Sequence, residues 1–321
     1  MYKKFFNLKE NPFNVNPDPR YLFLTRNTQE ALACLTYGIE TRKGFILLTG
    51  EVGTGKTTLL NKLLEWLHQQ RVSTAFVFNP RLSVSQFFDF MMADFGIPCE
   101  SRMKSQVLLK LNQWLLERYQ AGERAVLVVD EAQNLSPQML EEIRLLTNLE
   151  TSTEKLLQIV LAGQPELEQK LNQPQLRQLR QRITLRAKTL PLTLEETRGY
   201  IVERLRIAGS DADEVFSPEA IEAIHRHARG IPRVTNLLCE HALISAFVDQ
   251  RRPVTPETVD EVARDFDLHE IDPMAQPVVP PAANGNGHPP QLVESLLQAL
   301  NTLVERLNRP EVSPESEKEK H

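Results

Sequence analysis

The chain is 321 residues long, and its 41% hydrophobic and 25% charged residues are ordinary for a folded protein. At roughly 150 residues per domain, this length predicts two folded units and a tail. The 37 basic and 42 acidic residues give a formal net charge of -5, which argues against a surface built as a whole for nucleic-acid backbones or anionic lipid. A local basic patch is compatible with this balance.

Cysteine usage and the N-terminus favour a reducing compartment. Cys34, Cys99 and Cys239 are odd in number and far apart, so they form neither a disulfide framework nor a close pair of metal ligands. No stretch reaches the ~18 to 20 apolar residues that a membrane-spanning helix needs, and the first residues lack the features of a signal peptide. The sequence therefore predicts a soluble, cytoplasmic chain without a transmembrane segment.

From Thr25 onward, apolar runs bounded by turn residues alternate with helical patterns. This alternation is typical of buried parallel strands flanked by helices, and it predicts a doubly wound α/β domain. The expected strands cover 44–49, 74–79, 125–130, 156–162 and 183–188, and the expected helices cover 27–42, 56–70, 83–95, 102–120 and 137–149.

After Pro191 the pattern is helical only. Thr193, Ser217 and Thr255 are suited to cap helices, and the last two are each followed by a proline at the first helical position. The sequence predicts a small helical lid at 191–268, after a unit at 1–190 that combines an N-terminal segment with the α/β domain. The expected lid helices cover 193–208, 217–228, 232–250 and 255–266.

The C-terminal region has a different composition. Residues 269–290 contain six prolines and an Asn-Gly-Asn-Gly run, which predicts a flexible linker. Residues 291–308 carry an amphipathic helical pattern, and 309–321 form a charged tail. The helix either folds back on its own domain or mediates association with a second copy or a partner. Its seam consists of Val293, Leu297, Leu300, Val304 and Leu307.

A phosphate-binding motif follows the first expected strand. The run from Gly50 to Thr57 fits G-x4-G-K-[ST], with an apolar strand before it and a helical pattern after it. Glycines allow backbone N–H groups to surround phosphates, Lys56 reaches the β- and γ-phosphates, and Thr57 offers a hydroxyl to magnesium. The alternative is a glycine-rich connector with a surface lysine. The expected nucleotide-binding residues are Gly50, Glu51, Val52, Gly53, Thr54, Gly55, Lys56, Thr57 and Thr58.

Two acids end the third expected strand. Because ligands bind at the carboxyl ends of strands in an open α/β sheet, Asp130 and Glu131 are expected to lie beside the phosphate loop. Asp130 would hold magnesium through a water, and Glu131 would orient and deprotonate an attacking water. The alternative for Glu131 is an acid that interacts with the dipole of the next helix. Asn79 either restrains Glu131 or forms a turn.

The phosphate loop, the acid pair, a later strand, an arginine-rich stretch and a helical lid follow one another in the order seen in AAA+ ATPases, which the chain resembles over residues 1 to about 268. This resemblance implies three further catalytic residues. Gln164 would be the polar sensor of the γ-phosphate and water, and Arg233, in Gly-Ile-Pro-Arg, would read the phosphate from the lid. Arg180, in Leu-Arg-Gln-Arg-Ile, would enter the neighbouring subunit's site.

The sequence around Arg180 also allows another interpretation. Residues 170–188 contain four arginines, two lysines and no acid, so Arg180 would then belong to a solvated basic face. The same stretch is the best candidate for a nucleic-acid patch. The shared-site interpretation implies a homo-oligomer, a ring or a filament, with ATP sites between subunits.

A narrower resemblance rests on the N-terminus and on segments within the α/β region. Phe-Asn-Leu-Lys-Glu-Asn-Pro-Phe at 6–13, Pro-Asp-Pro-Arg-Tyr-Leu-Phe at 17–23 and Gly-Gln-Pro-Glu-Leu at 163–167 are similar to the ExeA-type general secretion pathway ATPases. The N-terminal segment would border the adenine, with Phe13 and Tyr21 as candidates; the alternative is that both aromatics pack against the core.

These resemblances imply a function as well as a fold. The expected protein is an ATPase that uses ATP and magnesium and acts on a protein partner of a secretion or envelope machine, in the cytoplasm or peripheral to the inner membrane through that partner. The alternative is an ATP-dependent DNA-binding regulator of transposition. Residues alone do not separate ATP from GTP.

Overall fold

The computed structural model describes residues 2–14, 16, 18–78, 82–98, 103–210 and 214–268, which lie in one compact unit spanning Met1–Asp272. The predicted linker, amphipathic helix and charged tail lie outside these residues, as do Asn79 and Cys99. Within the described residues, no helix combines the length and apolar content needed to cross a bilayer.

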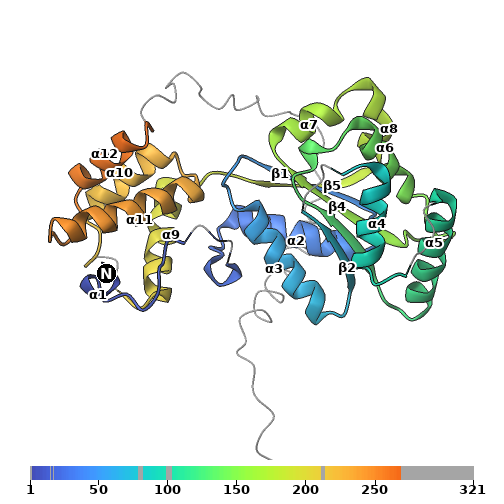
Figure 1. Cartoon of the computed structure of the whole chain (residues 1–321), viewed down its shortest axis with the longest axis horizontal. Helices are drawn as coiled ribbons and strands as arrows, with labels where there is room; N and C mark the ends of the chain where they lie inside the picture. The colour runs from blue at the N-terminus through green and yellow to red at the C-terminus, as the bar shows by residue number, and fades with distance from the viewer. Residues whose placement is uncertain are drawn as a thin grey trace, which may run out of the picture. The chain divides into compact units, whose positions relative to one another are not determined.

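A five-stranded parallel sheet with the order β2-β3-β4-β1-β5 forms the centre of the first part of the described chain (Figure 1). The predicted strands agree with these within one or two residues at each end, and the predicted doubly wound α/β fold is confirmed. The strands are β1 (Phe45–Gly50), β2 (Ser73–Val77), β3 (Ala125–Val129), β4 (Leu157–Gly163) and β5 (Ile183–Thr189).

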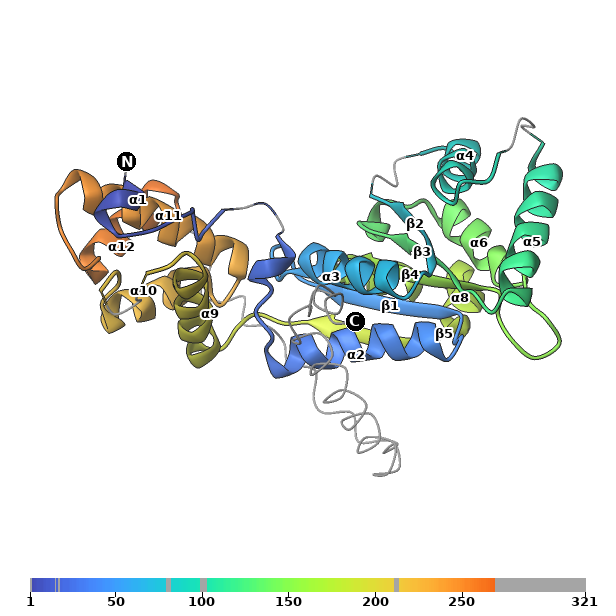
Figure 2. The same ribbon diagram turned by 90° about the horizontal axis from the view of Figure 1, so that it is seen from below.

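Helices cover both faces of this sheet (Figure 2). Because side chains alternate along a strand, Phe45 and Leu47 of β1 join one apolar core and Ile46 and Leu48 face the other side. On that other side, a Cβ at Gly38 would lie 2.6 Å from Cδ1 of Ile46. The helices are α2 (Arg26–Glu40), α3 (Lys56–Gln69), α4 (Val84–Asp94), α5 (Lys104–Gln120), α6 (Pro137–Leu146), α7 (Pro165–Leu171) and α8 (Arg177–Arg182).

The second core is helical and includes the N-terminal segment. From the sequence, that segment is expected to belong with the α/β domain, but Phe6, Leu8 and Phe13 are buried in the core of the lid helices. The short α1 (Tyr2–Phe5) packs on α11 (Pro232–Val248) (Figure 1). These apolar residues carry no periodicity that would connect them to helices almost 200 residues later. The lid helices are α9 (Leu194–Ile207), α10 (Pro218–Ala228), α11 (Pro232–Val248) and α12 (Pro256–Asp265).

The strand order determines where the chemistry-bearing residues meet. β4 lies between β3 and β1, with Thr49 paired to Gly163 and Val129 paired to Leu161. The segments that leave these three strands therefore emerge at the same edge of the sheet, because all strands run in the same direction.

Candidate nucleotide-binding site

A cavity of ≈ 370 Å³ lies where the segments after β1, β3 and β4 meet. Its walls come from these segments, the N-terminal segment, the start of α2, the end of β5 with the segment after it, and the lid helices α9 and α11. This volume suits a small-molecule ligand. Of the predicted residues, the cavity is lined by Val52 to Thr58, Glu131, Gln164 and Arg233.

The loop between β1 and α3 has the backbone shape that phosphate binding needs. Gly53 and Gly55 have φ angles of 81° and 94°, in the left-handed region, and Lys56 begins α3 directly after them. The hydroxyls of Thr54 and Thr189 lie 2.7 Å apart and fasten the loop to the end of β5. The loop thus presents its backbone at a helix N-terminus, where anions bind.

Lys56 points into this loop. Its Nζ donates to the carbonyl oxygens of Gly50 at 2.7 Å and Glu51 at 2.8 Å, and the residue is only 6% exposed. Burial lowers the pKa of Lys56, and the neighbouring charges of Glu131 and Asp130 oppose that shift. A buried ammonium group that faces a cavity is suited to stabilise a phosphate anion.

Asp130 and Thr57 have the chemistry of a magnesium site. The Thr57 hydroxyl donates to Asp130 Oδ2 at 3.0 Å, and the Glu131 N–H donates to Asp130 Oδ1 at 2.8 Å. A hydroxyl and a carboxylate supply the oxygen ligands that magnesium prefers. Burial raises the pKa of Asp130. The two oxygens therefore fit the predicted metal.

Glu131 and Gln164 are brought together although 33 residues separate them in sequence. Gln164 Nε2 donates to Glu131 Oε2 at 3.3 Å, and both residues line the cavity. Glu131 has a φ angle of 52° and precedes the short η2 (Ala132–Asn134), to which its side chain makes no capping bond. Its carboxylate is thus oriented by side-chain amides.

Arg233 approaches the phosphate loop from the lid. Its backbone N–H donates to the carbonyl of Gly53 at 3.2 Å, and its side chain is exposed and lines the cavity. A Cβ at Gly53 would lie 2.8 Å from Cβ of Arg233. Glycine at this position therefore permits close contact between the start of α11 and the loop.

Arg180 lies apart from the other predicted residues. It is exposed on α8, its Nη1 donates to Asn172 Oδ1 at 3.0 Å, and it does not line the cavity. Arg182, two residues later, donates to the Thr147 hydroxyl at 2.8 Å. Arg180 therefore lies outside the site that its own loop builds.

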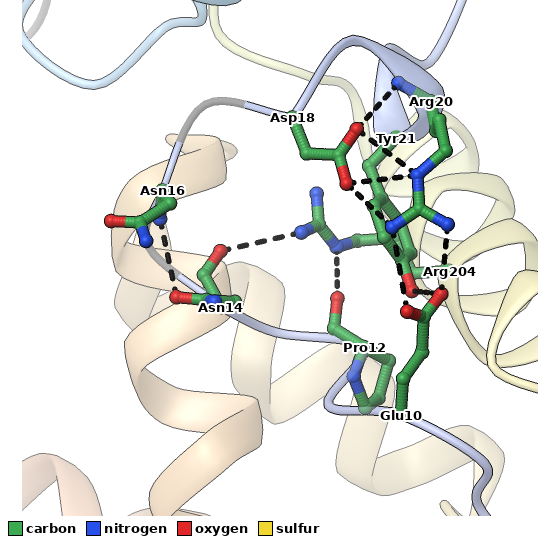
Figure 3. Close-up of polar contacts among 8 residues, drawn as sticks. All are labelled: Glu10, Pro12, Asn14, Asn16, Asp18, Arg20, Tyr21 and Arg204. Carbon is green, nitrogen blue, oxygen red and sulfur yellow. Dashed lines mark hydrogen bonds and ion pairs between the residues drawn. The ribbon is translucent and has the colours of Figure 1, made fainter.

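The motifs did not identify the wall of the cavity that α9 forms beside the N-terminal segment. Arg204 of α9 is buried, donates from Nε to the carbonyl of Pro12 and from Nη2 to that of Asn14, and its guanidinium lies 4.4 Å from the ring centre of Tyr21 (Figure 3). Tyr200 also donates to Asn236 Oδ1 at 2.8 Å. The sequence signal for these contacts of Arg204 is a basic residue within the apolar stripe of α9.

The two aromatic residues proposed to border the adenine have different positions. Tyr21 lines the cavity and donates to Glu10 Oε1 at 2.8 Å. Phe13 instead packs edge-to-face on Phe216, with ring centres 6.0 Å apart, in the helical core. Phe13 thus follows the alternative interpretation, and only Tyr21 is placed to contact a nucleotide.

Replacing Arg204 by Ala should destabilise the protein by about 2 to 4 kcal/mol, because the buried carbonyl of Pro12 and the partly buried carbonyl of Asn14 lose their donor and the rings of Tyr21 and Tyr200 lose a stacked cation. Chemical denaturation followed by circular dichroism measures this change. Arg206→Ala is the matched control on the same helix, since Arg206 is exposed and pairs with Glu203. Equal destabilisation by the two variants would contradict the role given to Arg204.

Comparisons with known proteins agree with the geometry. A family model described as "AAA domain" matches residues 39–171. General secretion pathway protein A of Aeromonas hydrophila is 47% identical over 248 residues, which make up 77% of this chain and 45% of that protein. The chain thus spans less than half the length of this relative.

Solved structures share the fold at low sequence identity. The ORC2 protein of Aeropyrum pernix, in its ADPNP and ADP complexes, has a TM-score of 0.60 and 16% identity, covering 82% of this chain and 73% of its own. Cdc6p of Pyrobaculum aerophilum has a TM-score of 0.57 and 19% identity, covering 75% of this chain and 66% of its own. The RuvB Holliday junction branch migration motor of Thermotoga maritima has a TM-score of 0.51 and 18% identity, covering 75% of this chain and 69% of its own.

Proposed function

Because the chain belongs to the AAA+ P-loop ATPases, we propose that it binds ATP with magnesium, hydrolyses it, and couples this turnover to self-assembly and to the remodelling of a protein partner. The observation that carries the proposal is the convergence of Lys56, Glu131, Gln164 and Arg233 on one cavity from four separate segments. Such convergence of a cation, a base and polar donors is the arrangement that phosphoryl transfer needs.

In the proposed reaction, a water oxygen attacks the γ-phosphorus while the bond to the β–γ bridging oxygen breaks, and ADP leaves. Glu131 accepts the proton of the water, and Gln164 orients the water or the γ-phosphate. Lys56 and Arg233 stabilise the negative charge on the phosphate oxygens. Thr57 and Asp130 would hold magnesium, which would supply positive charge against the negative charge of the phosphates.

Arg180 completes the site in this proposal from a neighbouring subunit. Its exposure and its position outside the chain's own cavity support a role across an interface. An arginine supplied by a second subunit adds positive charge to the transferring phosphoryl group, and hydrolysis then depends on assembly. A ring or filament of head-to-tail subunits repeats this arrangement.

The partner is proposed to belong to a secretion or cell-envelope machine, with the chain in the cytoplasm or peripheral to the inner membrane through that partner. The support is the similarity to general secretion pathway protein A. Filter binding with duplex DNA and ATP across a salt series tests the alternative DNA-binding function. Binding that weakens steeply with salt would favour DNA, and no binding at low salt would leave the envelope proposal.

Lys56→Ala is expected to abolish measurable ATP binding, because it removes the cation that faces the phosphates. Isothermal titration calorimetry with ATP and magnesium checks this result. Lys62→Ala is the matched control, since Lys62 lies on the same helix and pairs with Glu65 outside the cavity. Unchanged ATP affinity in Lys56→Ala would remove the phosphate loop from the proposed site.

A further inference from the structure

The side chain of Gln133 connects the ends of two strands. Its Nε2 donates to Oε2 of Glu131, and its Oε1 accepts from the backbone N–H of Gln164 at 3.1 Å. One amide therefore contacts both the carboxylate after β3 and the backbone after β4. Gln133 itself does not line the cavity, so it reaches the site through these two residues.

The position of this amide is determined by its surroundings. A Cβ at Gly163 would lie 2.7 Å from Oε1 of Gln133, so the absence of a side chain at the end of β4 leaves room for the amide. Lys170 of α7 donates from Nζ to the carbonyls of Gln133 and Leu135, the latter at 2.8 Å. The turn that carries Gln133 is therefore fastened to α7, the helix that Gln164 precedes.

We propose that Gln133 is a positioning residue for Glu131, which holds the carboxylate against the cavity and couples its position to the segment of Gln164. This inference rests on the proposed function, in which Glu131 is the base. The side chain of Glu131 makes no capping bond to η2, and the amides of Gln133 and Gln164 donate to the same oxygen, Oε2. Among the residues that the structure describes, no side chain donates to the second carboxylate oxygen, which can accept the proton of the attacking water.

Loss of the Gln133 side chain is expected to lower the rate of ATP turnover and to leave ATP affinity unchanged. Misplacing a catalytic group by about 1 Å can cost roughly 100-fold in rate, whereas Gln133 makes no contact with the loop that binds phosphate. A residue that only stabilised the turn would lower stability and ATP affinity along with rate. These two roles therefore predict different patterns in the same set of measurements.

The experiment uses the full chain and three variants. Gln133→Ala is expected to lower kcat roughly 10- to 100-fold with KM and ATP affinity unchanged. Gln133→Glu keeps an acceptor for the N–H of Gln164 but cannot donate to Glu131, so kcat should fall similarly. Gln138→Ala, an exposed position on α6 five residues away, is the matched control and should behave like the wild type.

A second measurement isolates the dependence on Glu131. In the Glu131→Gln background, Gln133→Ala should change the residual single-turnover rate less than about twofold, since no base is left to position. A further fall of 10-fold or more would overturn the inference, as would equal losses of ATP affinity and rate in Gln133→Ala. If Glu131→Gln retains turnover, the proposed role of Glu131 as the base fails, and with it any need to position that base. If Glu131→Gln is inactive and both Gln133 variants are normal, only the positioning role fails.

Discussion

Replacing Glu131 by Gln is expected to reduce ATP turnover by roughly 10²- to 10⁴-fold while ATP binding is retained. The amide is similar in size to the carboxylate but cannot accept a proton from the attacking water. Lys56 and the phosphate loop stay in place, because Glu131 makes no hydrogen bond to either in the structure. Phosphate release at saturating ATP and calorimetric binding to the same preparation measure the two quantities.

Glu195→Gln is the control for this experiment. Glu195 is an exposed acid in the first turn of α9, so it has the dipole interaction that the alternative interpretation assigned to Glu131. It has no position in the cavity. Normal turnover in Glu131→Gln would exclude a base at this position, and equal losses in the two variants would favour a structural effect of helix-start acids.

Replacing Arg180 by Ala is expected to lower turnover by roughly 10³- to 10⁵-fold, as for other arginines that reach a transferring phosphoryl group. Because the proposed site is shared, an equal mixture of the Arg180→Ala and Lys56→Ala proteins should recover activity. The Arg180→Ala subunit keeps its own phosphate loop, and the Lys56→Ala subunit keeps its own arginine. In a random mixture, about one quarter of head-to-tail interfaces would contain a complete site.

Arg186→Ala controls for loss of charge in the same basic stretch, since Arg186 is exposed on β5 and lies outside the cavity. Its turnover should stay close to that of the wild type. Specific activity of the wild type should also rise with protein concentration. Hydrolysis by a monomer at a constant specific activity, with no recovery in the mixture, would return Arg180 to a solvated basic face.

Local patterns in the sequence were sufficient to predict the secondary-structure elements and the phosphate loop. The apolar runs predicted all five strands, and the loop at Gly50 to Thr57 lies where its motif places it, between β1 and α3. Both depend on patterns among residues close in sequence, namely continuous apolar runs and backbone freedom at Gly53 and Gly55. The two acids after β3 follow from the same local reasoning.

Contacts between distant residues were decided only by the tertiary structure. The order β3-β4-β1 brings Glu131 beside Gln164, and the Gln133 amide then fits where Gly163 has no side chain. The burial of Phe13 among the lid helices likewise depends on surfaces that local periodicity does not describe. Periodicity specifies which face of an element is apolar, whereas the partner of that face is selected by packing across the whole chain. The sequence therefore determined the chemistry that is present, and the fold decided which groups act together.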